Sequence, residues 1–541
     1  MAADSAEEGS PRGTVRTRDQ RSPDESFDEH EDLYMSVDQL KGIAKMFEST
    51  HSMAVPFLER FRSTIKTVSL DGAGTVYEFD ADKLLWKKQS GDWLDLAISK
   101  FMTTYISEIL ELLYTSNSTD DETLVSKKAA CAILTKELQN FRSNKTSTVA
   151  AVRRVVVAAC QDSEFASLIN RSQPHMLPIR GGRVIDLRDS TVRNRTVEDL
   201  FTFELTVDIS TNAEQLQRAE IYLADIMINA DKRAYLKVLC GYFLTAETAD
   251  RGIYFFVGQG KNGKTFILRA LRSILWRFYA EVKKDIVIDC GRNQAMGNSH
   301  TAHLQPLTEA RVVSVDETDE DDKFAAGFVK KITGGSGLPI RGLYEKEQRT
   351  EGVTAKVVVP TNFTPIIDVT DKAVAARLRY LVFDTEFTDN PREGGEHPQR
   401  LEIPNLLNMV DSSHKRLFDS ELLDAIFTIF ADGARTYFQE YNGGNIPAPE
   451  CVMKALKDFM KSQDEVEEFV NTSLDVFELN APQRIFGEDL YLAYTDWRVR
   501  NDKAFDKKVP PNKFGKRVKQ LVPNKRLTNR QTYFCALKTD V

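Results

Sequence analysis

The residues with the clearest chemistry lie between Ile253 and Leu275. An apolar run is followed there by GQGKNGKT and then by apolar residues at helical spacing. Glycines let backbone N–H groups close around an anion, and the start of a helix adds free N–H groups and a positive dipole end. This pattern is typical of a phosphate-binding loop. Its residues are Gly258, Gln259, Gly260, Lys261, Asn262, Gly263, Lys264 and Thr265.

Two of these side chains and two later carboxylates predict ATP hydrolysis with Mg²⁺. Lys264 is expected to contact the β- and γ-phosphates of ATP, and the Thr265 hydroxyl to bind the metal. About fifty residues later, the apolar run VVSV ends in Asp316 and Glu317. Such a strand end fits a Walker B motif, in which Asp316 binds Mg²⁺ through water and Glu317 polarises the attacking water.

A third strand and two arginines complete the expected site. The run KVVVPT ends at Asn362, whose amide could sense the γ-phosphate and orient the water. In ring ATPases an arginine from the neighbouring subunit neutralises charge on the transferred phosphoryl group. Arg377 is the first candidate for this role and Arg379 the second. For each, the alternative is a salt bridge within its own subunit.

Two basic segments are candidates for binding DNA. The segment KKITGGSGLPIRGLYEKE, residues 330–347, is expected to form an exposed loop or hairpin. Its cations Lys331, Arg341 and Lys346 could bind a sugar-phosphate backbone in a central channel. A solvated loop with no ligand is the alternative.

The C-terminal segment reverses the sign of the chain's charge. From Arg498 to Lys538 it holds thirteen Lys or Arg and two acidic residues. A helix, a polar turn and a closing strand suggest a winged helix, able to contact phosphates of a duplex or fork. A site for an acidic partner is the alternative. The candidate DNA-binding residues are Lys513, Lys516, Arg517, Lys519, Arg526 and Arg530.

Composition indicates a soluble globular protein, and the strand, loop and helix pattern of the motifs predicts an α/β fold. The chain has 541 residues, of which 42% are hydrophobic and 28% charged. No apolar run approaches twenty residues and no leader is recognisable, so neither a membrane span nor secretion is expected. The net charge of −8 does not argue against DNA, because the distribution of charge decides binding. The six cysteines lie far apart and predict neither disulfides nor a zinc site.

Five segments are expected along the chain. Residues 1–35 hold ten acidic and four basic side chains and predict a disordered tail. A mainly helical region covers 36–230, in which Trp86 and Trp93 are expected in the core, with stacking on bases as the alternative. The ATPase core covers 231–390, a helical linker 391–450, and the winged-helix-like basic domain 451–541.

Several of these motifs together resemble the superfamily 3 helicases. They are GQGKNGKT with Asn262 before its last glycine, the strands VVSVDE and VVVPTN, the segment KKITGGSGLPIRGLYEKE, and LPIRGGRVIDLR at residues 177–188. The resemblance is closer to the helicase half of the primase-helicases of poxviruses and other large nucleocytoplasmic DNA viruses. It extends from about residue 76 to residue 541.

This resemblance implies an AAA+ core that forms a hexameric ring, with ATP between subunits and single-stranded DNA in the channel. Translocation would run 3′ to 5′, at a viral replication site in the host cytoplasm or nucleus. About 75 residues precede the similarity, too few for the family's primase domain, so primer synthesis is expected elsewhere. A separate primase, a polymerase or other replication proteins are the expected partners. A phage or plasmid replicon helicase, and an origin-binding or scaffold ATPase that unwinds nothing, are the alternatives.

Overall fold

The computed structural model divides the chain into two compact units. The first takes Met1–Glu78 and Lys88–Ser163, and the second Phe79–Lys87 and Glu164–Val541. The acidic segment expected to be disordered lies outside the described residues, except for Met35. The structure describes residues 35–68, 75–117, 120–289, 302–319, 322–335, 337–340, 349–363, 365–367, 371–388, 399–401, 419–501, 503, 509–527 and 530–538.

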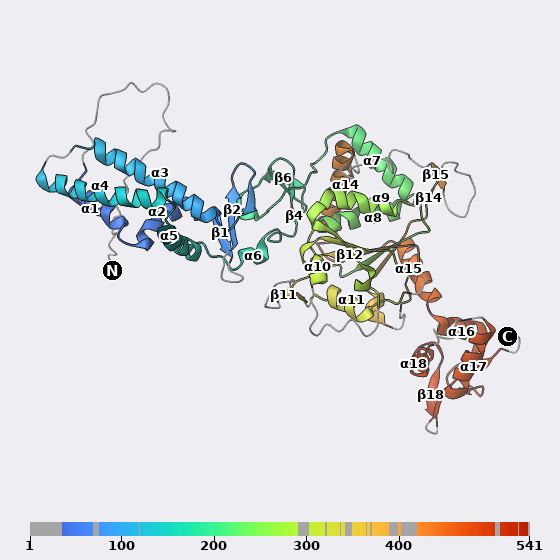
Figure 1. The fold of residues 1–541 in the computed structure, drawn as a ribbon. Coiled ribbons are helices and arrows are strands. Elements are labelled where there is room, and N and C mark those ends of the chain that lie inside the picture. Colours follow the sequence, from blue (N-terminus) through green and yellow to red (C-terminus); the bar gives the residue numbers. More distant parts are fainter. Residues whose placement is uncertain are drawn as a thin grey trace, which may run out of the picture. The chain divides into compact units, whose positions relative to one another are not determined.

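The first unit is mainly helical, as expected for this region. Strand β1 (Ile65–Val68) pairs antiparallel with the start of β2 (Thr75–Asp80). Apolar residues at helical spacing on α3 are buried and form much of the core of this unit. Its helices are α1 (Val37–Met46), α2 (Thr50–Phe61), α3 (Trp93–Thr115), α4 (Asp121–Arg142) and α5 (Thr146–Ala159) (Figure 1).

The second unit begins with short strands around a buried tryptophan. Trp86, on β3 (Leu85–Lys88), donates a hydrogen bond from Nε1 to the Val197 carbonyl at 2.9 Å and packs against Phe165. The expectation that Trp86 belongs to the core is thereby confirmed. The neighbouring elements are α6 (Phe165–Leu168), the antiparallel strands β4 (Met176–Ile179), β5 (Arg183–Asp186) and β6 (Thr191–Asn194), and a 3-10 turn at Val197–Asp199.

A five-stranded parallel sheet forms the centre of the second unit. Its order is β13-β7-β12-β9-β8, and each neighbouring pair is parallel. Such a sheet is consistent with the core of a P-loop ATPase, so the predicted α/β class is confirmed. The strands are β7 (Ile253–Val257), β8 (Tyr279–Val282), β9 (Val312–Val315), β12 (Lys356–Thr361) and β13 (Leu378–Val382).

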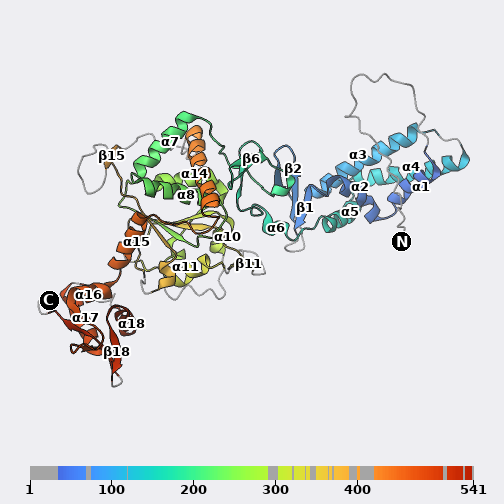
Figure 2. The same cartoon turned by 180° about the vertical axis from the view of Figure 1, so that it is seen from behind.

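Both faces of this sheet are buried, which explains why its strands are almost wholly apolar. On β7, Tyr254 and Phe256 belong to one core, and Ile253 and Phe255 to the other. Figures 1 and 2 show α7, α8 and α14 on one side of the sheet and α11 on the other. The covering helices are α7 (Ala213–Ile226), α8 (Ala230–Leu244), α9 (Lys264–Leu275), α10 (Pro306–Glu309), α11 (Ala326–Thr333), α12 (Lys372–Ala375) and α14 (Ser420–Glu440).

Helix α14 comes from the range expected to be a linker, yet it packs in the ATPase core. It crosses α8 with the two backbones in contact. A Cβ atom on Gly241 would lie 2.1 Å from the Ala434 nitrogen, and one on Gly433 would lie 2.1 Å from the Lys237 carbonyl oxygen. Only glycine fits such a crossing. Residues 164–230, expected with the N-terminal region, likewise belong to the second unit.

Short strand pairs flank the core. Strands β10 (Leu338–Ile340) and β11 (Arg349–Glu351) form an antiparallel pair. Strands β14 (Glu386–Thr388) and β15 (Gln399–Leu401) pair in parallel. Four short 3-10 turns, one of them the Val197–Asp199 turn, complete the described elements; the others are Trp276–Phe278, Lys284–Ile286 and Ala302–Leu304.

The C-terminal segment has its own small core around Phe469, Tyr494 and Phe514. Strands β17, β18 and β19 form an antiparallel sheet in the order β17-β19-β18, and β16 pairs with β20. No helix in the described part of the chain is long and apolar enough to cross a membrane. Helix α15 (Glu450–Ser462), expected within the C-terminal domain, packs instead against the core of the parallel sheet, where Phe459 stacks on Tyr380 of β13. The elements of the C-terminal segment are α16 (Glu465–Ser473), β16 (Leu474–Val476), β17 (Ile485–Phe486), α17 (Gly487–Arg500), α18 (Pro511–Leu521), β18 (Asn524–Leu527), β19 (Arg530–Tyr533) and β20 (Cys535–Leu537).

Candidate nucleotide-binding site

The glycine-rich loop joins the end of β7 to the start of α9. Gly260 and Gly263 have φ angles of +99° and +88°, which favour glycine. Gly258 is required by close approach, because a Cβ atom there would lie 2.0 Å from Asn262 Nδ2. At Gly263 a Cβ atom would also lie 2.7 Å from Ile226 Cγ1 on α7. The loop is thus built to present backbone groups at a helix start.

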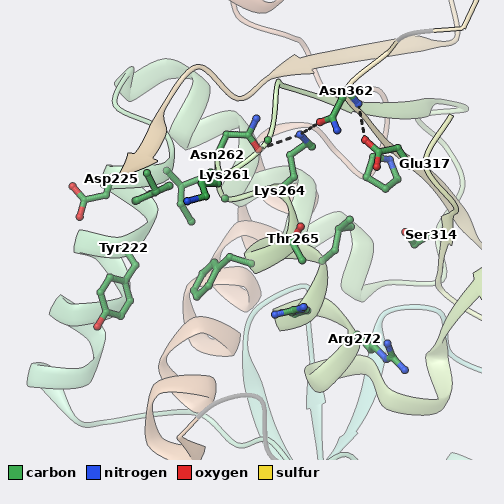
Figure 3. Close-up of a pocket in the computed structure, with 18 of the residues that line it drawn as sticks. Tyr222, Asp225, Lys261, Asn262, Lys264, Thr265, Arg272, Ser314, Glu317 and Asn362 are labelled. Atoms are coloured by element: carbon green, nitrogen blue, oxygen red, sulfur yellow. Dashed lines mark hydrogen bonds between the residues drawn. The ribbon is translucent and has the colours of Figure 1, made fainter. Parts of the chain in front are cut away.

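Lys264 is the first residue of α9, and its ammonium group points back into the loop (Figure 3). Nζ donates hydrogen bonds to the Gly258 carbonyl at 2.5 Å, to Asn262 Oδ1 at 3.1 Å and to Asn362 Oδ1 at 3.0 Å. Burial lowers the pKa of Lys264 from its usual range, and the nearby Glu317 carboxylate opposes that shift. A single cation therefore connects the loop with the end of β12.

The ends of β9 and β12 bring the predicted carboxylate and amide together. The Asn362 N–H donates to Glu317 Oε1 at 3.2 Å. Thr361 is paired with Val257, the last residue of the P-loop strand, so Asn362 emerges beside the loop. Lys264, Asn362 and Glu317 thus form one connected group at the carboxyl edge of the parallel sheet, where ligands of α/β proteins bind.

A contact between two buried hydroxyl groups, those of Thr318 and Thr361, connects the strand ends that carry Glu317 and Asn362. Thr318 Oγ1 lies 2.7 Å from Thr361 Oγ1 and 2.7 Å from the Phe363 carbonyl oxygen. The Phe363 N–H donates to Thr361 Oγ1 at 2.9 Å. Both threonines are inaccessible, at 1% and 0% exposure. Sequence reasoning missed this pair, because a threonine beside a strand end has no signature of its own.

A cavity of about 670 Å³ opens in front of the loop. Glu317 and Asn362 line one end, and Tyr222 and Asp225 from α7 lie at the other (Figure 3). The Phe387 N–H donates to the Lys261 carbonyl at 2.7 Å and ties β14 to the loop. No sequence motif marks the lining residues outside GQGKNGKT, VVSVDE and VVVPTN, which are Tyr222, Asp225, Ile226, Phe266, Leu268, Arg269, Arg272, Tyr279, Glu281 and Phe387.

The oxygen donors expected for a metal suit Mg²⁺. The Thr265 side chain is exposed and lines the cavity. Asp316 is exposed and directly precedes Glu317, and its N–H donates to the Val282 carbonyl at 3.0 Å. A hydroxyl and a carboxylate are hard ligands of the kind that Mg²⁺ prefers beside substrate phosphates. The chemistry of the donor set therefore fits this metal; Thr265 lines the cavity, whereas Asp316 does not.

The two candidate arginines have different surroundings. Arg379 Nε and Nη2 each bind the Asp250 carboxylate at 3.0 Å, and Asp250 also accepts from the Tyr254 hydroxyl at 2.7 Å. Arg379 therefore makes the salt bridge that was its alternative. Arg377 Nε donates to Thr333 Oγ1 at 2.8 Å.

Arg377 lies at the amino end of β13, far from the cavity of its own subunit. Leu378 pairs with Ile253, and Val382 with Val257, at the P-loop end of the parallel ladder. At about 3.3 Å per residue, the strand places Arg377 roughly 16 Å from the loop. The side chain is thus remote from its own P-loop, as a residue acting on a neighbouring subunit has to be.

The candidate DNA-binding residues between the motifs are only partly described. Lys331 lies in the last turn of α11. Arg341 and Lys346 lie outside the described residues, although β10 and β11 form an antiparallel pair on either side of them. Lys331 therefore lies on a helix and not on the expected loop, and DNA binding by these three cations stays a prediction.

The C-terminal cations separate into three groups. Arg517 donates to Asp464 at 2.5 Å and to Glu467 at 2.8 Å, so it joins α18 to α16. Lys516, Lys519 and Arg530 line a hollow of about 760 Å³. Lys513 and Arg526 are exposed and lie outside the residues that line it.

Comparisons with known proteins relate the chain to viral replication proteins. No family model matches it. A putative helicase of Acanthamoeba polyphaga mimivirus is 22% identical over 489 residues, which are 87% of this chain and 48% of the relative. A putative primase of African swine fever virus is 23% identical over 283 residues, or 52% of this chain and 28% of the relative. The chain thus spans about half the length of the first relative and less of the second.

A further viral relative and a solved structure complete the comparison. A putative helicase of Frog virus 3 is 23% identical over 254 residues, 47% of this chain and 25% of the relative. A solved structure of the NrS-1 C-terminal region aligns with 91% of this chain and 100% of its own, at 8% identity and a TM-score of 0.38. A score this low carries no argument about function or fold.

Proposed function

Because the chain is homologous to putative helicases and primases of nucleocytoplasmic large DNA viruses, we propose that it is an ATP-dependent DNA helicase. The observation that carries this proposal is the connected group of Lys264, Asn362 and Glu317 at the edge of the parallel sheet. It combines a phosphate-binding cation with a carboxylate and an amide for a water molecule. The proposal places the chain in superfamily 3, acting in viral genome replication without primase activity of its own.

Hydrolysis would proceed by in-line attack of water on the γ-phosphate of ATP. The loop N–H groups and Lys264 bind the phosphates, Asn362 orients the water, and Glu317 accepts its proton. Thr265 and Asp316 would hold Mg²⁺, which neutralises charge on the phosphates when bound. Arg377 would complete the site of the neighbouring subunit and stabilise the charge that develops on the transferred group.

The proposed assembly is a homohexamer that moves 3′ to 5′ on single-stranded DNA through a central channel. Ring and polarity come from the resemblance, and Arg377 supports a shared site because it lies remote from its own loop. The C-terminal segment would act as a winged helix. Its order of α16, β17, α17, α18, β18 and β19, with the sheet order β17-β19-β18, supports that assignment.

Strand displacement on forked DNA tests the proposal. Wild type should hydrolyse ATP, respond to DNA and separate the strands. Lys264→Ala should lower ATP turnover by roughly two orders of magnitude or more, because the phosphates lose their main cation. Lys100→Ala changes an exposed lysine on α3 and should leave both activities unchanged. Hydrolysis without DNA stimulation or unwinding in the wild type would instead indicate an origin-binding or scaffold ATPase.

A further inference from the structure

The hollow in the C-terminal segment lies between α17, α18 and β19. Asn512, Gly515, Lys516 and Lys519 line it from α18. Their spacing places them on one face of that helix. Phe514, which is buried in the small core, also lines the hollow, whereas Val518 does not.

Two glycines keep this hollow open. A Cβ atom on Gly515 would meet only the Tyr533 hydroxyl, at 3.8 Å. A Cβ atom on Gly487, at the start of α17, would meet the Tyr533 ring at 3.4 Å. Tyr533 is buried, and its hydroxyl donates to the Gly515 carbonyl at 3.2 Å. Because neither glycine has a side chain next to the buried Tyr533 ring, the hollow extends to that ring.

The lining combines cations with apolar and aromatic surface. Lys516, Lys519 and Arg530 supply positive charge, while Tyr491 and Leu492 supply apolar surface from α17. Leu492 is 62% exposed, so its apolar surface is accessible to a ligand.

An aromatic ring also lies next to one of these cations. The Arg530 guanidinium lies 5.6 Å from the centroid of the Phe486 ring, and both residues line the hollow. The Glu488 carboxylate lines it too and could accept a hydrogen bond from an amino group. Phosphate, a flat ring and an exocyclic amine are together the groups of a nucleotide.

These features favour an unpaired base, and not a duplex, as the ligand of the hollow. Binding to duplex phosphates requires protruding cations and has no use for an apolar hollow. Single-strand sites combine a cationic groove with aromatic side chains that stack on bases. The volume, about 760 Å³, lies within the roughly 300–1,000 Å³ common for pockets that enclose a small organic group.

We propose that this hollow binds an unpaired base of single-stranded DNA together with its neighbouring phosphates. The base lies against Tyr491 and Leu492, and Lys516, Lys519 and Arg530 hold the backbone. The C-terminal segment thus holds the single strand at a fork. This inference rests on the proposed DNA helicase function, and it deepens that function by naming what the segment binds.

Gly515→Leu in the full chain tests the hollow without changing its charge. The new side chain has space at its Cβ, and leucine favours a helix more than glycine does, so folding should be preserved. Gly42→Leu is the matched control, because a Cβ atom on this α1 glycine meets nothing within 4 Å.

Affinities for a short single strand and for a duplex of the same length are measured by fluorescence anisotropy. Gly515→Leu should weaken single-strand binding by roughly tenfold or more, since one stacked base contributes that much. Duplex affinity and ATP hydrolysis without DNA should not change. A single strand with 5-iodouracil should photocrosslink to Tyr491 or Phe486 in wild type and Gly42→Leu, and lose that crosslink in Gly515→Leu.

Other results would overturn the inference. An equal loss of single-strand and duplex affinity would show that this face binds duplex phosphates. Unchanged single-strand binding with no crosslink in this segment would show that the hollow is not a base site, while strand displacement by the wild type would leave the helicase proposal standing. If the wild type binds no DNA, both proposals fail.

Discussion

At the scale of single residues, the site depends on how Glu317 and Asn362 are held relative to each other. The Asn362 N–H reaches Glu317 directly, and the hydroxyl groups of Thr318 and Thr361 join the two strand ends behind them. Neither threonine lines the cavity. The two threonines therefore act by positioning Glu317 and Asn362. Their replacement should lower the rate of ATP turnover more than it weakens nucleotide binding.

Replacing Thr318 by valine tests this positional role. Thr318→Val keeps the volume but removes a buried hydroxyl and leaves the Phe363 carbonyl with one partner fewer, which costs about 1–3 kcal/mol of unfolding free energy. We expect kcat for ATP to fall by roughly tenfold and KM to change little, because the loop and Lys264 are untouched. Steady-state kinetics and urea unfolding measure both quantities. Thr104→Val, at an exposed position on α3, is the control; an unchanged kcat in Thr318→Val would leave Thr318 a purely structural role.

The sequence predicts those site residues that belong to a short contiguous pattern. The loop glycines and Lys264 form one contiguous pattern, and Glu317 and Asn362 each end an apolar strand. Asp225 and Phe387 reach the cavity only through tertiary structure, so no spacing reveals them. Likewise, Arg379 pairs with Asp250, which lies far away in the sequence, so the sequence alone could rank Arg379 second to Arg377 but could not show its partner.

At the scale of secondary structure elements, β13 is anchored to the start of β7 by a buried ion pair. Asp250 precedes β7 and is inaccessible, and its carboxylate accepts from Arg379, from the Tyr254 hydroxyl and from the Ile446 N–H. Buried pairs of this kind are costly to break from one side, because the remaining charge has no compensation.

Asp250→Asn should therefore destabilise the second unit by about 3–5 kcal/mol. Urea unfolding measured in parallel with DNA-free ATP hydrolysis checks this expectation. Asp432→Asn is the matched control, because its partner Arg435 lies on the exposed surface of α14, where ion pairs contribute about 1 kcal/mol or less. If Asp250→Asn left the stability unchanged but reduced ATP hydrolysis, Arg379 would again be a candidate for the residue that acts on the neighbouring subunit.

Element boundaries were harder to predict than element types. The α/β class follows from apolar runs between helical patterns, and the five-stranded parallel sheet agrees with it. The range 391–450 is predicted as a helical linker, yet α14 contributes a buried face to the core. One signal was available: a glycine inside a helical pattern, such as Gly433, often marks a close helix contact.

At the scale of the whole molecule, the proposed ring requires that each active site take residues from two subunits. Lys264 belongs to the cavity of its own chain, whereas Arg377 lies at the opposite end of the sheet. Replacing Lys264 would then remove the residue that a subunit supplies to its own site. Replacing Arg377 would remove the residue that it supplies to the site of its neighbour.

Mixing the two variants tests this division. Arg377→Ala and Lys264→Ala should each be nearly inactive alone. In a random equal mixture about one quarter of the interfaces would combine an intact loop with an intact arginine, so ATP hydrolysis should reappear in proportion. Native mass spectrometry would verify that the subunits exchange. If the subunits exchange but ATP hydrolysis does not recover, the active site is not shared between subunits.

The glycine crossing of α8 and α14 also affects how the protein is made. A ribosome completes α8, the P-loop and the strands of the sheet well before it reaches Gly433. Until then the narrow face around Gly241 has no helix against it, and apolar surface of the growing chain stays exposed. Nascent chains in that condition are prone to aggregate and depend on chaperones. The two helices that follow the sheet in the sequence, α14 and α15, therefore decide when synthesis yields a folded core.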